Sequence, residues 1–136
     1  MIIGIIGSRS RNRPIDFEQV NNKFFEIYED GDWICSGGCP QGGDKFAEVI
    51  AKDNGIPMLI FWADPEKTPK SYFDRNTDIA GHSDVLIACI TDDDSKCKGT
   101  MDTVRKFKKR KTTGQVYLIK EDNTIEIMGE PEDPWK

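Results

Sequence analysis

The sequence predicts an α/β fold, a three-layer Rossmann-like domain with a mainly parallel sheet of about five strands and a C-terminal hairpin strand. Short and almost wholly apolar runs recur along the chain, and such runs are typical of strands buried on both faces of a parallel sheet. Segments with a helical spacing of apolar residues separate these runs, which is the pattern of βαβ units. Right-handed crossovers in a Rossmann-type strand order of 3-2-1-4-5 would make the first and fourth strands neighbours.

The expected strands follow the apolar runs, at residues 2–6, 33–35, 57–62, 85–90, 115–119 and 124–128. The expected helices lie between them, at residues 16–30, 44–55, 71–80 and 99–113. Asp16 is expected to cap the first helix, because Gln19 three residues later completes a capping-box pattern. Gly81 is expected to end the third helix, since glycine is common just after the last helical residue.

The size and charge of the chain restrict its class. The 136 residues fit one domain over residues 1–128, followed by a tail over residues 129–136. A net charge of −5 argues against indiscriminate nucleic-acid binding, which depends on a broad positive field. The apolar start over residues 1–7 lacks the basic region of a signal peptide, and no run approaches the roughly 20 apolar residues of a membrane helix. We therefore expect a cytoplasmic protein without a membrane partner, whose four cysteines are free thiols.

The loop after the fourth strand indicates an anion site. Gly99 and Thr100 open the last helix, so free backbone N–H groups and the positive end of the helix dipole lie at the C-terminal edge of the sheet. Such a phosphate-binding loop favours a nucleotide or a related anion. An ordinary helix start, in which Thr100 caps its own helix, is the alternative.

Two further loops should converge on the same edge. The loop over residues 7–14 carries Arg9, Arg11 and Arg13, which would point the same way in an extended chain. Arg9 is nearest the strand end and is the arginine that we expect to bind the ligand. The loop over residues 36–43 has four glycines, more than one turn needs, and is expected to form a wall of the ligand site.

Motifs at these strand ends resemble the SLOG superfamily, a group of Rossmann-like domains that includes the Lonely Guy phosphoribohydrolases and the DNA-processing protein A family. The residues that carry the resemblance are Gly7, Ser8, Arg9, Ser36, Gly37, Gly38, Gly42, Gly43, Asp44, Arg75, Asn76, Lys98, Gly99 and Thr100. The resemblance spans residues 2–119 and is greatest to the small stand-alone members. It implies that these residues bind a nucleotide or nucleotide-derived ligand, with its phosphate at the Gly-Thr helix start.

The same resemblance indicates two candidate catalytic residues. In the Lonely Guy enzymes, an arginine before the fourth strand and a glutamate just after the Gly-Thr pair serve N-glycosidic cleavage. Arg75 matches the arginine, whereas Thr103 stands at the glutamate position and the neighbouring Asp102 is the nearest acid on that helix turn. Ser95-Lys96-Cys97 stand where that motif has Pro-Gly-Gly. We therefore expect ligand binding with weak or absent cleavage.

The function favoured by the sequence is binding of a nucleotide or nucleotide-derived small molecule, with the domain acting as a sensor. A nucleoside 5'-monophosphate phosphoribohydrolase is one alternative. A DNA-associated accessory protein is another, and it depends on the basic segment at residues 105–111.

No cofactor and no metal site are expected. The acids at residues 92–94 suit a solvated loop, and the cysteines and His82 lack a zinc-ligand spacing. The sequence neither predicts nor excludes a homo-oligomer. The candidate interface residues are Phe24, Phe25, Trp62 and Phe73.

Overall fold

The computed structural model describes residues 1–64, 66 and 70–129 of the chain. Its sheet has the strand order β3-β2-β1-β4-β5-β6. The neighbouring strands are parallel from β3 to β5, and β6 pairs antiparallel with β5. The strands are β1 (Ile2–Gly7), β2 (Trp33–Ser36), β3 (Met58–Ile60), β4 (Val85–Cys89), β5 (Val116–Ile119) and β6 (Ile125–Met128). The predicted α/β class, the strand order and the C-terminal hairpin strand are therefore confirmed, whereas residues 130–136 of the predicted tail lie outside the described residues.

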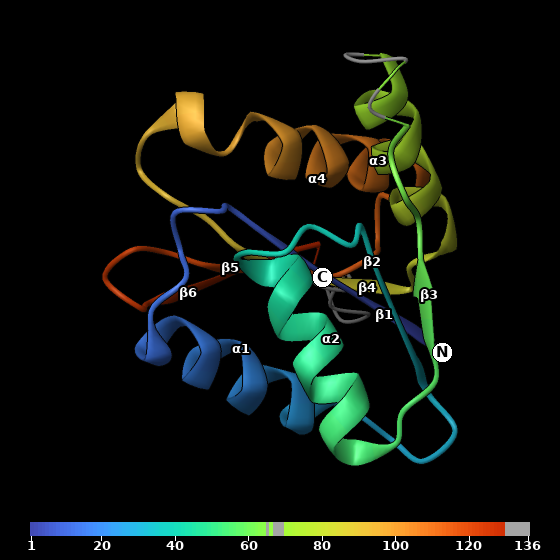
Figure 1. Cartoon of the computed structure of the whole chain (residues 1–136), viewed down its shortest axis with the longest axis vertical. Coiled ribbons are helices and arrows are strands. Elements are labelled where there is room, and N and C mark those ends of the chain that lie inside the picture. Colours follow the sequence, from blue (N-terminus) through green and yellow to red (C-terminus); the bar gives the residue numbers. More distant parts are fainter. Residues whose placement is uncertain (65, 67–69, 130–136) are drawn as a thin grey trace, which may run out of the picture.

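The helices of the described residues are α1 (Pro14–Ile27), α2 (Gly43–Asn54), α3 (Lys70–His82) and α4 (Lys98–Arg110). A single 3-10 turn, η2 (Asp94–Lys96), precedes α4. In Figure 1, α1 and α2 lie together, and the strands separate them from α3 and α4. Within the described ranges, no helix has the length and apolar character needed to cross a membrane.

The central strands supply side chains to two separate cores, because successive residues of a strand point to opposite faces of the sheet. Ile3 and Ile5 of β1 pack with residues of α1 and α2, whereas Ile6 packs with residues of α3 and α4. β4 alternates in the same way and is buried along its whole length. Of the four candidate interface residues, Phe24 is fully buried in the first core and is therefore not available to a partner chain.

Several helix boundaries differ from those expected: α1 and α4 each end three residues earlier, and the start of α1 and the end of α3 have clear local reasons. α1 begins at Pro14, whose fixed φ suits the first helical position, and Arg13 is the N-cap. Asp16 is therefore not the cap but the third helical residue, and its carboxylate accepts a hydrogen bond from the Arg13 N–H at 3.0 Å. α3 continues through Gly81 to His82, because a glycine inside a helix weakens it but does not end it when the flanking turns are packed.

Glycines allow α2 to begin in direct contact with β1. A Cβ atom on Gly43 would lie 2.3 Å from the carbonyl carbon of Ile6 and 2.4 Å from the nitrogen of Gly7. A Cβ on Gly7 would in turn lie 2.9 Å from the carbonyl oxygen of Cys89. Only glycine permits this approach, which brings the start of α2 next to the ends of β1 and β4.

Candidate functional site

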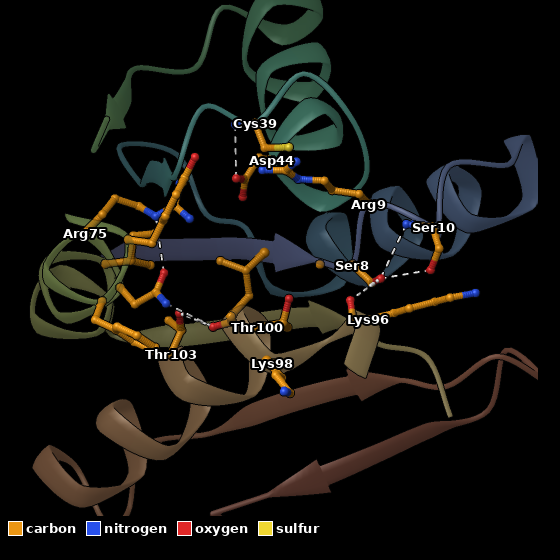
Figure 2. Close-up of a pocket in the computed structure, with 17 residues that line it drawn as sticks. Ser8, Arg9, Ser10, Cys39, Asp44, Arg75, Lys96, Lys98, Thr100 and Thr103 are labelled. Carbon is orange, nitrogen blue, oxygen red and sulfur yellow. Dashed lines mark hydrogen bonds between the residues drawn. The ribbon is translucent and has the colours of Figure 1, made fainter. Parts of the chain in front are cut away.

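A pocket of about 690 Å³ opens at the C-terminal edge of the sheet, between the loop after β1, the start of α2, the first turns of α3 and the start of α4. Figure 2 shows the side chains that line it. The expected site residues that line this pocket are Gly7, Ser8, Arg9, Asp44, Arg75, Asn76, Lys98, Gly99 and Thr100. The other expected site residues, all within the described ranges, lie outside the lining: Ser36, Gly37, Gly38, Gly42, Gly43 and Asp102.

The start of α4 forms one wall of the pocket. The first amides of a helix have no intrahelical partner, and no side-chain hydrogen bond caps α4. A Cβ on Gly99 would have only the Asn76 Nδ2 atom nearby, at 3.9 Å, so the backbone at Gly99 is open to a ligand. Thr100 is 9% exposed and its hydroxyl has no hydrogen-bond partner among the described residues. A polar side chain and free amides therefore face the same space.

The charges around the pocket are mostly positive. Arg9, Arg75, Lys96 and Lys98 contribute cationic side chains, and Asp44 is the one carboxylate among the described lining residues. Arg9, Lys96 and Lys98 are exposed and can adjust to a ligand. This distribution favours an anion over a cation or a neutral molecule.

Asp44 is buried, and its carboxylate is held in place by the loop after β2. The Ser36 hydroxyl donates toward Asp44 Oδ1 at 2.6 Å and toward the Ile5 carbonyl oxygen at 2.5 Å. The Cys39 N–H donates to Asp44 Oδ2 at 3.1 Å, a contact that Figure 2 marks. Ser36 thus acts on the pocket through Asp44 rather than by lining it.

The glycines of the loop after β2 support the pocket from behind. Gly42 has a φ of +72°, and a Cβ there would lie 2.4 Å from the Ser8 carbonyl oxygen. Gly38 has a φ of +73° and packs against the Trp62 ring. The carbonyl oxygen of Gly37 accepts a hydrogen bond from Arg75 Nη1 at 2.9 Å. The glycines therefore permit close packing, and the pocket wall itself comes from their neighbours.

The three arginines of the loop after β1 do not point the same way, contrary to expectation. The Arg11 N–H donates to the Ser8 carbonyl oxygen at 3.1 Å, so the chain turns between them instead of running extended. Arg11 is 2% exposed and pairs with Asp16, and Arg13 also pairs with Asp16. Arg9 alone of the three lines the pocket.

Ser8 joins the loops after β1 and β4. Its hydroxyl donates to the Lys96 carbonyl oxygen at 2.8 Å and lies 2.9 Å from the Ser10 hydroxyl oxygen. Figure 2 shows this cluster at the side of the pocket opposite Arg75. The contact fixes η2, and with it Lys96, beside the start of α4.

Asp102 lies behind the pocket wall rather than in it. Its carboxylate accepts a hydrogen bond from Asn76 Nδ2 at 3.2 Å and pairs with Lys106 Nζ at 2.9 Å. Thr103 does line the pocket, but it is 1% exposed and its hydroxyl donates to the Gly99 carbonyl oxygen at 3.1 Å. No carboxylate therefore reaches the pocket from α4.

The basic segment at the end of α4 is largely used within the fold. The internal partners of its side chains are Asp102 and Phe73 O for Lys106, Thr112 O and Gly114 O for Lys108, Gly81 O for Arg110, and Asp84 for Lys111. One of these partners, the Gly81 carbonyl oxygen, lies in the last turn of α3, where a cation is favourable. These four of its six basic side chains thus have partners within the fold, while Arg105, Lys109, Arg110 and Lys111 are exposed to solvent.

None of the four cysteines, all of which lie in the described part of the chain, forms a disulfide. Burial raises the pKa of the Cys35 thiol to about 11 and that of Cys89 to about 12, so neither is a nucleophile at neutral pH. Over the described ranges, no three His, Cys, Asp or Glu side chains come together to hold a metal ion.

The lining residues that the sequence reasoning missed are Ile6, Ser10, Cys39, Tyr72, Phe73, Ile79, Lys96 and Thr103. For two of them a signal was present. Tyr72 stands three residues before Arg75, and Phe73 stands three before Asn76, so each shares a helix face with an expected site residue. The helix that carries them follows β3 and therefore starts at the same edge of the sheet as the other loops.

Comparison of the chain with family models, with curated proteins and with solved structures finds no match in any of the three.

Proposed function

We propose that this chain is a three-layer Rossmann-like domain of the SLOG type that binds a nucleotide or nucleotide-derived ligand in the cytoplasm, as a sensor. The ligand's phosphate binds at the start of α4. The observation that carries the proposal is the uncapped helix start at Gly99 and Thr100, together with the unpartnered hydroxyl of Thr100, a residue that is itself only 9% exposed and lines the pocket. Backbone amides, a hydroxyl and a helix dipole together suit a phosphate oxygen.

The charges and size of the pocket support the same proposal. Arg9, Lys96 and Lys98 are exposed cations around the start of α4, and guanidinium and ammonium groups form charge-assisted hydrogen bonds with phosphate. A volume of about 690 Å³ falls within the range of about 300–1,000 Å³ that is usual for small-ligand pockets.

The two alternatives have less support. Hydrolysis of the N-glycosidic bond would need an acid aimed at the ribose, and Asp102 is engaged with Asn76 and Lys106 outside the pocket lining. Binding to DNA would need an open basic surface, and the segment at residues 105–111 is largely hydrogen-bonded within the fold.

Calorimetric titration with AMP and ribose 5-phosphate tests the proposal, with Gly99→Ala as the main variant. An added Cβ would enter the pocket without touching the fold, so the variant should unfold at the same temperature or higher, since alanine favours a helix. Its affinity for both probes should fall about tenfold or more, because each charge-assisted hydrogen bond lost costs about 1.5–3 kcal/mol. Lys52→Ala, at the exposed far end of α2 and outside the pocket lining, is the control for an alanine substitution elsewhere on a helix and should bind as the wild type does. Undiminished binding by Gly99→Ala would contradict the proposed phosphate position.

A further inference from the structure

Tyr72 and Phe73 are large aromatic side chains that the fold leaves unburied at the pocket. They are 37% and 48% exposed, and both line the pocket from the first turn of α3. Apolar rings exposed singly on a surface are common, but two adjacent rings at the edge of a charged pocket form a surface that can contact a ligand.

Both rings are held by neighbouring cations. The Arg75 guanidinium lies over the Tyr72 ring, 5.6 Å from its centroid, while Arg75 Nη1 donates to the Gly37 carbonyl oxygen. Lys106 Nζ lies 5.4 Å from the Phe73 ring centroid and donates to the Phe73 carbonyl oxygen at 2.8 Å. These contacts favour one orientation of each ring before a ligand binds, which lowers the entropy cost of stacking against them.

The pocket thus has two chemically different parts. The start of α4 with Lys96 and Lys98 suits an anion, whereas the first turn of α3 offers aromatic faces, and the apolar side chain of Ile79 lies in the same lining. In the view of Figure 2, Arg75 and Lys96 lie on opposite sides with Thr100 between them. A ligand that satisfies both parts carries an anionic group at one end and a flat aromatic group at the other.

We infer that Tyr72 and Phe73 form the subsite for a nucleobase, so that the pocket selects nucleotides over sugar phosphates. This inference rests on the proposed function, since the phosphate must be anchored at α4 for the base to reach α3. Stacking on an aromatic side chain tolerates any base, because every base has a π face. The rings therefore fix the ligand class, and the identity of the base is left to other contacts.

The test compares ribose 5-phosphate with AMP, GMP, CMP and UMP by calorimetry. Wild-type protein should bind at least one nucleotide more tightly than ribose 5-phosphate, and that nucleotide is the probe for the variants. Tyr72→Ala and Phe73→Ala should each lower the affinity for the probe nucleotide by about 5- to 100-fold, the usual effect of losing a base-stacking ring. Both variants should bind ribose 5-phosphate within about twofold of the wild type, which also shows that they are folded. Tyr72→Phe keeps the ring and should keep the affinity.

Phe25→Ala is the matched control, because Phe25 is 43% exposed, lies on α1 and is outside the pocket lining. It should bind the nucleotide as the wild type does. Equal affinity of the wild type for ribose 5-phosphate and all four nucleotides overturns the inference alone, as does full retention of nucleotide affinity by both alanine variants. If neither ribose 5-phosphate nor any nucleotide binds to the wild type, the proposed function and the inference both fail.

Discussion

Arg11 Nη2 and Asp16 Oδ1 lie 2.9 Å apart in a buried ion pair, with the two residues 2% and 0% exposed. The remaining donors of Arg11 reach the carbonyl oxygens of Ile90 at 2.5 Å and Ile119 at 3.1 Å, and Asn123 Oδ1 at 3.2 Å. One guanidinium therefore joins the loop after β1 to the ends of β4 and β5 and to the hairpin before β6. Arg11 therefore has a structural role, and it does not line the pocket.

Arg11→Met should lower the free energy of unfolding by about 3–5 kcal/mol, because it removes one partner of a buried ion pair. It also leaves two carbonyl oxygens without their charged donor. Urea denaturation measures the change. Arg9→Met is the control, since Arg9 is exposed, and its stability should change by less than about 0.5 kcal/mol. A similar decrease in the free energy of unfolding for Arg11→Met and Arg9→Met would show that the buried ion pair does not stabilise the fold more than an exposed arginine does.

The stability of the fold should depend on pH through Asp16. Burial works against ionisation of this carboxylate, but hydrogen bonds from Arg13 and Arg11 outweigh it, so the pKa of Asp16 lies below its ordinary value. A carboxylate with a lowered pKa in the folded state stabilises the fold above its unfolded pKa, which is near 4 for aspartate. That contribution is lost as the pH falls through the folded pKa, so the free energy of unfolding should decrease below about pH 4.

Asp16→Asn separates this effect from general acid unfolding. The variant should be less stable than the wild type at neutral pH and should lose less stability between about pH 5 and pH 3, as measured by urea denaturation. Glu18→Gln changes an exposed carboxylate on the same helix and should keep the wild-type acid dependence. An unchanged acid dependence in Asp16→Asn would show that other carboxylates determine it.

Arg9 and Arg75 should respond differently to removal, although the sequence treats them alike. Arg9→Ala should weaken AMP binding by an amount equivalent to about 1.5–3 kcal/mol while melting at the wild-type temperature, because Arg9 lines the pocket and is exposed. Arg75→Ala should lower the affinity for AMP and also the melting temperature, because Arg75 donates hydrogen bonds to the Gly37 carbonyl oxygen and to Asn76 Oδ1. Calorimetry of the two variants measures the change in AMP affinity, and thermal melting measures the change in stability. A loss of melting temperature in Arg9→Ala with unchanged affinity would assign Arg9 a structural role.

The sequence was sufficient for the sheet because its evidence is local. Apolar runs mark buried strands, and right-handed crossovers then restrict their order, which the structure confirms. The direction of a loop side chain has no such local evidence. Alternation places Arg9, Arg11 and Arg13 on one side only in an extended chain, and the hydrogen bond from Arg11 to Ser8 removes that condition.

In the candidate site too, the sequence indicates which segments take part but not the direction in which their residues point. The glycine loop was identified from its composition, but whether a glycine faces a ligand or a neighbouring backbone depends on the packing of another segment. For Gly43 that segment is the end of β1, which leaves no room for a side chain. The sequence does not indicate that Tyr72 lies at the site, because an aromatic residue near a helix start usually packs in the core, and only the packed structure shows that this ring stays at the pocket.

The last prediction concerns catalysis by Asp102. Successive residues of a helix are about 100° apart around its axis, so Asp102 cannot point where Thr103 points. The structure agrees with that geometry, since Thr103 lines the pocket and Asp102 is held outside the lining by Asn76 and Lys106. A catalytic group misplaced by about 1 Å can already cost roughly 100-fold in rate.

We therefore expect no appreciable release of free base from AMP, GMP, CMP or UMP by the purified protein, measured as free base and ribose 5-phosphate. Asp102→Asn should keep the wild-type affinity for these nucleotides, because the carboxylate does not line the pocket. It should lower the melting temperature, since it weakens the ion pair with Lys106 at 2.9 Å. Turnover by the wild type that disappears in Asp102→Asn, with affinity retained, would instead make Asp102 the acid of a phosphoribohydrolase and would require α4 to rotate when the nucleotide binds.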